Sequence, residues 1–293
     1  MSRVAGARGV LIPPDERSCR STGCVSERIF AMREITVGCC QFESEPGNVE
    51  VNLVRVEEFV AGFAGDGVDL LVLPEMWSCA FPPSHLGAMA EKTPMVLERL
   101  AEWASRHGMV LVGSLPEADG AVIYNTSYVV ERSGEIVGKY RKMHRFSFTG
   151  EDRHFGRGEE TVVCPTSVGK LGIMICYDLR FPEVARRLAL DGAEIICVSA
   201  QWPVPRIDHW SILLRSRAIE NQLFVLGCNG CGREGKLQYA GKSVVVSPYG
   251  NVPAEAGAGT EKLTARIDVD EVARFRKHIT CFADRLPGAY GLF

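Results

Sequence analysis

Short apolar runs alternate along this chain with longer segments in which apolar residues recur every three or four positions. Apolar runs of about four to eight residues predict buried strands, and the wider spacing predicts amphipathic helices. Strands are expected at 34–42, 69–74, 109–115, 123–131, 135–140, 172–176, 194–200, 223–229 and 238–246. This alternation of two element types predicts a layered α/β domain.

Two segments show the helical spacing clearly. Residues 48–64 carry apolar side chains on one face, and residues 94–107 do the same, with Thr93 as the expected N-cap and Pro94 in the first helical position. No internal repeat or linker separates these elements, so a single domain is expected from 32 to 293.

The first 31 residues differ from the rest of the chain. They mix Arg, Ser, Pro and Gly without any period, which predicts a disordered extension or an upstream start that the cell does not use. A targeting peptide is disfavoured because Asp15, Glu16 and Glu27 place acidic residues in the segment.

Composition narrows the class of protein. With 293 residues, 46% of them hydrophobic and 24% charged, the chain can bury a sizeable core, and no apolar run reaches the length of a membrane span. A net charge of -3 gives no electrostatic case for binding nucleic acid. Many of the 11 cysteines lie inside strand-like runs and no secretory segment precedes them, which predicts a soluble protein of the reducing cytoplasm.

The strongest chemical signal is Cys176, at the tip of the apolar run that starts at Gly172. The carboxyl end of a strand is where an α/β fold opens to substrate, although a free cysteine is more often a small buried hydrophobic residue. A nucleophilic thiol needs a base to take its proton and a cationic or hydrogen-bonding group for the oxyanion that it creates.

Two other strand ends supply such groups. Glu75 follows the run 69–74, and Lys142 follows the strand expected after the turn at Ser133 and Gly134. Each alone could be a surface charge at the end of a strand. Their occurrence together with Cys176, each at a strand end, favours a shared site.

These residues lie in motifs that resemble the nitrilase superfamily of carbon-nitrogen hydrolases, which carries a Glu-Lys-Cys triad. The matching motifs run from Leu73 to Trp77, from Tyr140 to His144 and from Cys176 to Glu183. The resemblance implies two mixed sheets flanked by helices, an α-β-β-α sandwich that associates with another subunit. It also implies a helix over 209–222 behind the nucleophile.

The resemblance further implies one role for each residue. Glu75 would be the general base, Cys176 the nucleophile, and Lys142 with the backbone N–H of Tyr177 the oxyanion site. A second glutamate is expected at Glu151, with Asp152 as the alternative. No metal or organic cofactor is implied, and Cys228 and Cys231, which have the spacing of a zinc or redox pair, lack a second pair.

The short loop from Lys142 to Gly150, Arg180 and the segment from Trp202 to Arg206 resemble the ω-amidase branch, which hydrolyses the side-chain amide of dicarboxylic acid monoamides such as 2-oxoglutaramate or 2-oxosuccinamate. The planar guanidinium of Arg180 would then bind the substrate carboxylate, whereas its structural alternative is an ion pair with Asp178 or Glu183. Three aromatic residues are candidate pocket walls, although such residues are often core: Phe42, Phe146 and Trp202.

Other functions share the same triad. An N-carbamoyl amino acid, an amide of the deaminated-glutathione type or a nitrile is an alternative substrate, and a catalytically silent assembly scaffold is the alternative outside enzymes. The tail from about 279 to 293 resembles a family segment that lies over a neighbouring subunit, which predicts a homodimer or a larger homo-oligomer.

Overall fold

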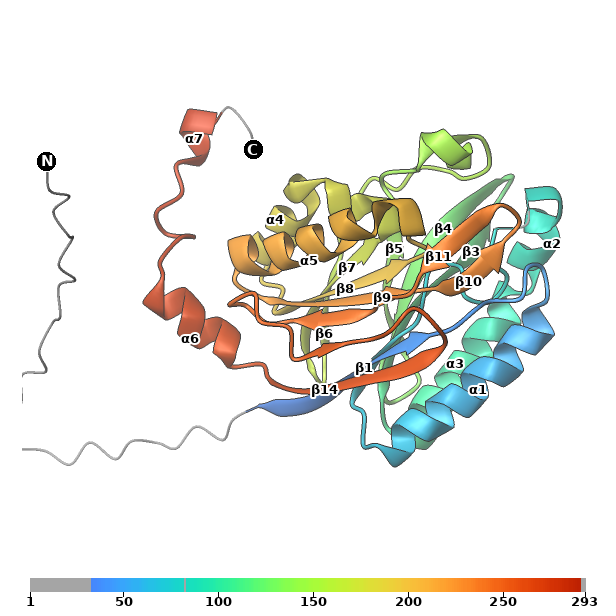
Figure 1. Ribbon diagram of the computed structural model, residues 1–293, viewed down its shortest axis with the longest axis horizontal. Coiled ribbons are helices and arrows are strands. Elements are labelled where there is room, and N and C mark those ends of the chain that lie inside the picture. Colours follow the sequence, from blue (N-terminus) through green and yellow to red (C-terminus); the bar gives the residue numbers. More distant parts are fainter. Residues whose placement is uncertain (1–32, 82, 291–293) are drawn as a thin grey trace, which may run out of the picture. The chain divides into compact units, whose positions relative to one another are not determined.

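Two six-stranded sheets lie face to face in the computed structural model, which describes residues 33–81 and 83–290 (Figure 1). The extension predicted for residues 1–31 lies outside the described residues. Helices cover the outer face of each sheet, so the order of layers is helix, sheet, sheet, helix. The predicted α-β-β-α sandwich is confirmed.

Both sheets are mixed. In the first, β1, β2 and β3 are parallel and the other pairs are antiparallel; in the second, β7, β8 and β9 are parallel. The first sheet runs in the order β14 (Glu261–Asp268), β1 (Glu34–Gln41), β2 (Leu70–Val72), β3 (Val110–Asp119), β4 (Val122–Val130) and β5 (Ile136–Arg141). The second runs in the order β13 (Ala254–Glu255), β12 (Val244–Val246), β9 (Phe224–Asn229), β8 (Ile195–Ala200), β7 (Gly169–Ile175) and β6 (Val163–Thr166). A separate hairpin joins β10 (Cys231–Glu234) to β11 (Leu237–Ala240).

Helices α1 (Val49–Gly65) and α3 (Thr93–His107) lie on the first sheet, whereas α4 (Pro182–Leu190) and α5 (Ile207–Asn221) lie on the second (Figure 1). The shorter helices are α2 (Leu86–Glu91), α6 (Glu271–His278) and α7 (Pro287–Tyr290). Single 3₁₀ turns occur at η1 (Pro83–His85), η2 (Ser147–Thr149), η3 (Glu151–Arg153), η4 (Cys176–Arg180) and η5 (Val204–Arg206). The helix expected over 209–222 is α5.

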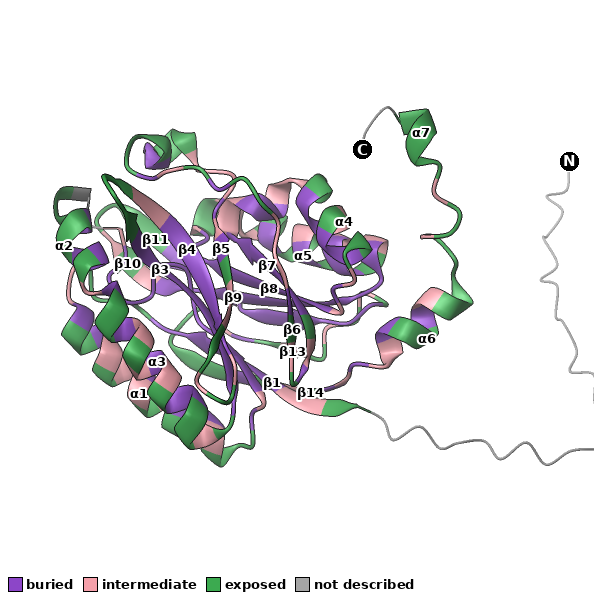
Figure 2. Cartoon of the chain, turned by 180° about the vertical axis from the view of Figure 1, so that it is seen from behind, coloured by how far each residue is buried: buried purple, intermediate pink, exposed green. Residues whose placement is uncertain are grey.

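Side-chain alternation explains how the first sheet contacts both layers. In β1, Cys39 packs into the core between the sheets, and its neighbour Cys40 packs under α1 and α3. Leu70 and Leu71 of β2 divide in the same way, because successive side chains of a strand point to opposite faces. Figure 2 shows the strands buried along most of their length, while the helices are buried on one side only.

Two details of the predicted elements were wrong. Thr93 lies inside α3 rather than at its N-cap, which is Lys92, and the Thr93 hydroxyl donates to the carbonyl of Pro116 instead. The strand expected over 238–246 is two strands in different sheets, β11 and β12. Gly241 (φ 62°) and Lys242 (φ 58°) interrupt it, since left-handed backbone cannot continue a strand.

Beyond α6 the chain extends away from the sandwich (Figure 1). From Ile279 to Tyr290, all side chains other than Phe282 and Arg285 are exposed. That this segment lies over another subunit stays a prediction. In the described residues no helix combines the length and the apolar character needed to cross a membrane.

Candidate active site

Glu75, Lys142 and Cys176 come from three strands of the two facing sheets. Glu75 follows β2, Lys142 is the first residue after β5, and Cys176 is the first residue after β7. All three line one cavity of about 330 Å³. The fold therefore brings together the three groups that the sequence placed at strand ends.

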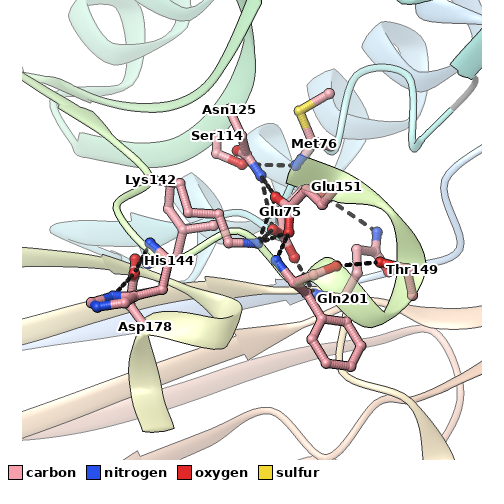
Figure 3. A network of polar contacts seen from close by, with 12 residues as sticks. Glu75, Met76, Ser114, Asn125, Lys142, His144, Thr149, Glu151, Asp178 and Gln201 are labelled. Carbon is pink, nitrogen blue, oxygen red and sulfur yellow. Dashed lines mark hydrogen bonds and ion pairs between the residues drawn. The ribbon is translucent and has the colours of Figure 1, made fainter. Parts of the chain in front are cut away.

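Lys142 is the centre of this cluster. Its Nζ lies 2.7 Å from Oε1 of Glu75 and 2.8 and 2.9 Å from the two carboxylate oxygens of Glu151 (Figure 3). The side chains are 3%, 2% and 6% exposed for Lys142, Glu75 and Glu151. Because all three groups are buried, water screens the electrostatic attraction between the cation and the two carboxylates only weakly.

Further donors fix the two carboxylates. Asn125 Nδ2 donates to Glu75 Oε1 at 2.8 Å, and the backbone N–H of Gln201 donates to Glu75 Oε2 at 3.0 Å. The backbone N–H of Phe146 donates to Glu151 Oε2 at 2.7 Å. Glu75 is thus bound at both oxygens, and the loop after β5 holds Glu151 in place.

The protonation states follow from burial and from these neighbours. Burial raises the pKa of Glu75, and the charge of Lys142 partly opposes that rise. Burial also acts to lower the pKa of Lys142, but the carboxylates of Glu151 and Glu75 outweigh it and raise that pKa well above the ordinary value. Lys142 is therefore a permanent cation beside a carboxylate of increased basicity.

Cys176 is held as a neutral thiol. Burial and the charge of Glu75 raise its pKa well above the ordinary value, while the charge of Lys142 lowers it. Hydrogen bonding from the thiol in turn lowers the pKa of Glu75, because it stabilises the ionised carboxylate. A neutral thiol needs a base before it can act as a nucleophile, and the carboxylate of Glu75 lines the same cavity.

The backbone at Cys176 is left-handed, with φ of 43°. A non-glycine residue in this region carries a steric cost that the surrounding structure must offset. The turn places Cys176 at the start of η4, whose first backbone N–H groups have no acceptor within the helix. Tyr177, the second residue of η4, carries one of these N–H groups beside the thiol.

Asp178 secures this turn. Its fully buried carboxylate accepts from Tyr140 Oη at 2.8 Å, from the backbone N–H groups of His144 and Ile175, each at 3.0 Å, and lies 2.9 Å from His144 Nδ1. One carboxylate therefore ties the end of the lysine strand to the end of the cysteine strand.

The outer part of the cavity is aromatic and cationic. The guanidinium of Arg180 lies 4.6 Å from the ring centroid of Trp202, and its Nη1 is 3.2 Å from Nδ1 of His209. Phe146 packs against Tyr177 with ring centroids 4.8 Å apart, and both line the cavity. The structural alternative for Arg180, an ion pair with Asp178 or Glu183, does not occur among the described residues.

The residues predicted for the pocket are present with one exception. Phe146 and Trp202 line the cavity, but the placement of Phe42 was wrong. Phe42 is 1% exposed and packs on Phe59 in the core under α1, with ring centroids 6.0 Å apart. Glu151 rather than the exposed Asp152 faces Lys142.

The sequence did not predict three residues that hold the site together: Asn125 and Gln201, which donate to Glu75, and Asp178, which joins two strand ends. Asn125 lies inside a predicted strand, where a buried amide gives no sign of its partner. The available signal was the polar triplet of Asn125, Thr126 and Ser127 within an otherwise apolar run.

No group of three or more His, Cys, Asp or Glu in the described residues has a metal-binding arrangement. Cys228 and Cys231 have different neighbours: Cys228 Sγ donates to the carbonyl of Cys40, and Cys231 lies 3.6 Å from the hydroxyl of Thr260.

Comparison with known proteins agrees with this geometry. A model of the carbon-nitrogen hydrolase family matches residues 36–277. The chain belongs to the carbon-nitrogen hydrolase family. Its similarity to the nitrilase superfamily, expected from the motifs, is thereby confirmed.

Relatives within this family cover most of the chain. The 2-oxoglutaramate amidase of Bacillus subtilis is 36% identical over 251 residues, which are 85% of this chain and 96% of the relative. An omega-amidase of Saccharomyces cerevisiae is 32% identical over 277 residues, covering 88% and 95%. The crystal structure of the Saccharomyces cerevisiae nitrilase-superfamily member Nit3 superposes with a TM-score of 0.78 at 31% identity, covering 84% of this chain and 94% of that one.

Proposed function

We propose that this carbon-nitrogen hydrolase releases ammonia from the ω-amide of a small dicarboxylic acid monoamide, of the 2-oxoglutaramate or 2-oxosuccinamate type, through a thioester on Cys176. The observation that supports it most strongly is the buried cation Lys142, bound to Glu75 and Glu151 in the cavity that also holds the thiol.

In the proposed reaction Glu75 takes the proton of the Cys176 thiol as the sulfur attacks the amide carbon. The carbonyl oxygen becomes an oxyanion, which Lys142 and the backbone N–H of Tyr177 stabilise. Glu75 then returns the proton to the nitrogen as the carbon–nitrogen bond breaks, and ammonia leaves. The product on the enzyme is a thioester.

Water completes the cycle. Glu75 takes a proton from the attacking water, a second oxyanion forms at the same place, and its collapse breaks the carbon–sulfur bond. The proton returns to the sulfur and the free acid departs. Glu151 keeps Lys142 charged and oriented throughout, because both of its oxygens lie within 2.9 Å of Nζ.

The substrate class rests on the outer part of the cavity. A planar guanidinium binds a carboxylate at two points, and Arg180 presents one there without an acidic partner among the described residues. Two relatives that cover most of this chain are named for hydrolysis of 2-oxoglutaramate and of ω-amides. Phe146 and Trp202 would flank the short carbon chain of the substrate.

An ammonia-release assay tests this function. The purified protein is given ω-amides of dicarboxylic acids, N-carbamoyl amino acids, an amide of the deaminated-glutathione type and nitriles, and the ω-amides are expected to have the highest kcat/KM. Cys176→Ala should abolish turnover, and Lys142→Met should reduce kcat by about 100-fold or more through loss of an oxyanion donor. Circular dichroism confirms that each variant is folded.

Three results would contradict the proposal. Preference for a carbamoyl compound or a nitrile would keep the chemistry and change the substrate, and turnover by Cys176→Ala would overturn the chemistry itself. A folded wild-type protein that is inactive on the whole panel would favour the assembly scaffold.

The cellular context is part of the proposal. The described residues include nine free cysteines, of which only Cys281 is exposed. Free thiols without disulfides are compatible with a reducing cytoplasm. The exposed side chains Leu286 and Tyr290 of the C-terminal segment support contact with a second copy of the chain. Light scattering after size-exclusion chromatography would test the homodimer, with a monomer as the contrary result.

A further inference from the structure

A second guanidinium, that of Arg206, lines the same cavity as Arg180. Trp202 links the two arginines. Its Nε1–H donates to the carbonyl of Arg206 at 2.7 Å, and its ring lies beneath the guanidinium of Arg180 at 4.6 Å. Trp202 therefore contacts the guanidinium of Arg180 through its ring and the backbone of Arg206 through its N–H, and both arginines line the cavity.

Arg206 has aromatic rather than acidic neighbours. Its guanidinium lies 5.3 Å from the ring centroid of Phe146 and 5.5 Å from that of Phe148, and within the described chain no carboxylate is within ion-pair distance of it. Burial lowers the pKa of Arg180, and the charge of Arg206 lowers it further. The two guanidinium groups are therefore close enough to repel each other electrostatically.

The carboxylate of Glu234, which also lines the cavity, does not neutralise this pair. Its two oxygens accept from the backbone N–H of Phe81 at 2.9 Å and from Tyr239 Oη at 2.8 Å. Two partly buried guanidinium groups without a carboxylate partner have N–H donors available for an anion or another acceptor. If the substrate carboxylate binds the guanidinium of Arg180, the N–H donors of Arg206 are available for a neighbouring group of the substrate.

We propose that Arg206 binds an oxygen on the carbon next to the substrate carboxylate, so that the site selects 2-oxo acid amides and excludes the corresponding 2-amino acids. This inference rests on the proposed function. A keto oxygen accepts from a guanidinium, whereas the ammonium group of an amino acid has no lone pair and is repelled by both cations.

Three amides of equal length provide the test: 2-oxoglutaramate, glutaramate and glutamine, which differ only at the carbon next to the carboxylate. Arg206→Met should lower kcat/KM for 2-oxoglutaramate by about 10- to 100-fold, the range for a lost hydrogen bond to a charged group. It should change glutaramate by less than about 3-fold and should increase kcat/KM for glutamine, since repulsion decreases.

Two controls separate charge from geometry. Arg206→Lys keeps the positive charge and should still exclude glutamine while losing part of the preference for the 2-oxo group. Arg215→Met removes an exposed arginine of α5 that does not line this cavity, and should leave all three substrates unchanged.

A binding measurement is independent of turnover. In the Cys176→Ala background, calorimetry should show 2-oxoglutarate binding about 10-fold tighter than glutarate, and Arg206→Met should remove that difference. Equal losses of kcat/KM on all three amides would mean that Arg206 acts through Phe146 and Phe148 on the loop after β5. No loss of kcat/KM on any amide would mean that Arg206 does not contact the substrate. Either result overturns the inference. Inactivity of the wild type on all three amides would instead refute the proposed function.

Discussion

The side-chain amide of Asn125 donates a 2.8 Å hydrogen bond to Oε1 of Glu75, the oxygen that also accepts from Lys142. The same Nδ2 lies 3.5 Å from Oε1 of Glu151. Asn125 is 1% exposed and stands in β4, next to the strand that delivers Lys142. It is therefore a positioning residue for both carboxylates.

Replacement of Asn125 by leucine should reduce kcat by about 10-fold or more, since loss of a hydrogen bond to a buried charged group costs about 1.5 to 3 kcal/mol. The lost donor stabilised the ionised carboxylate, so the pKa of Glu75 should rise further and the acid limb of the kcat/KM profile should move to higher pH. Steady-state kinetics across pH measures both effects.

Ser127→Ala is the matched control for this variant. Ser127 lies two residues further along β4, is equally buried, and its hydroxyl has no partner in the described chain. Its removal should leave the profile in place. An Asn125→Leu enzyme that loses stability but keeps the wild-type pH profile would contradict the positioning role.

The rate of the enzyme should rise with pH as Glu75 loses its proton. Because burial raises the pKa of Glu75 above 4.5, the midpoint of this acid limb should lie above that value, and Glu75→Gln should remove the limb together with most activity. The same base should control alkylation of Cys176 by iodoacetamide, since the pKa of the thiol is raised well above 9.0.

Peptide mass mapping after timed alkylation would measure this effect. Modification of Cys176 should slow markedly in Glu75→Gln, because loss of the proton acceptor outweighs the opposite effect of removing a charge that raises the pKa of the thiol. The exposed Cys281 provides an internal control whose rate should not change. Equal alkylation of Cys176 with and without the Glu75 carboxylate would show that this group does not act as the base.

Asp178 should matter for folding as well as for activity. Its carboxylate accepts from groups on β5, on the following loop and on β7, so Asp178→Asn replaces an acceptor oxygen by a donor in a fully buried site. The free energy of unfolding should fall by about 3 kcal/mol or more. Urea denaturation followed by tryptophan fluorescence gives this value.

Asp191→Asn offers the comparison for Asp178. Asp191, the C-cap residue of α4, forms an i,i+4 pair with Arg187 at 2.8 Å, and loss of such a surface pair should cost less than about 1 kcal/mol. If both variants were equally stable, the buried carboxylate would not be the link between the two strands.

The left-handed backbone at Cys176 predicts an unusual order of stabilities. Cys176→Gly should be more stable than Cys176→Ala by about 0.5 to 1 kcal/mol, because glycine avoids the steric cost of positive φ, although both variants are inactive. At Cys197, inside strand β8, the order should reverse. Alanine proving the more stable residue at position 176 would argue against strain at the nucleophile.

The sequence by itself determined where the reactive groups stand relative to their own strands. Glu75 and Cys176 follow apolar runs, and an apolar run that stops at a charged or polar residue marks the end of a strand without knowledge of the rest of the chain. Lys142 follows a strand that the turn at Ser133 and Gly134 indicates. The layered α/β class followed from the same alternation.

Residues whose role depends on another element were not predictable in this way. Phe42 also follows a strand, yet its side chain lies on the face toward α1, because the choice of face depends on what the sheet packs against. The strand predicted over 238–246 is interrupted by the left-handed Gly241 and Lys242, whose conformation depends on contacts outside the segment.

The tertiary structure alone decided which polar groups meet. Asn125 and Asp178 contact residues 50 and 38 positions away, Glu75 and Tyr140, and no period in the sequence encodes such a separation. Hydrophobic patterning specifies which side chains leave water, but a buried hydrogen bond also requires its partner at the correct distance and direction, and only the packing of the two sheets sets that geometry.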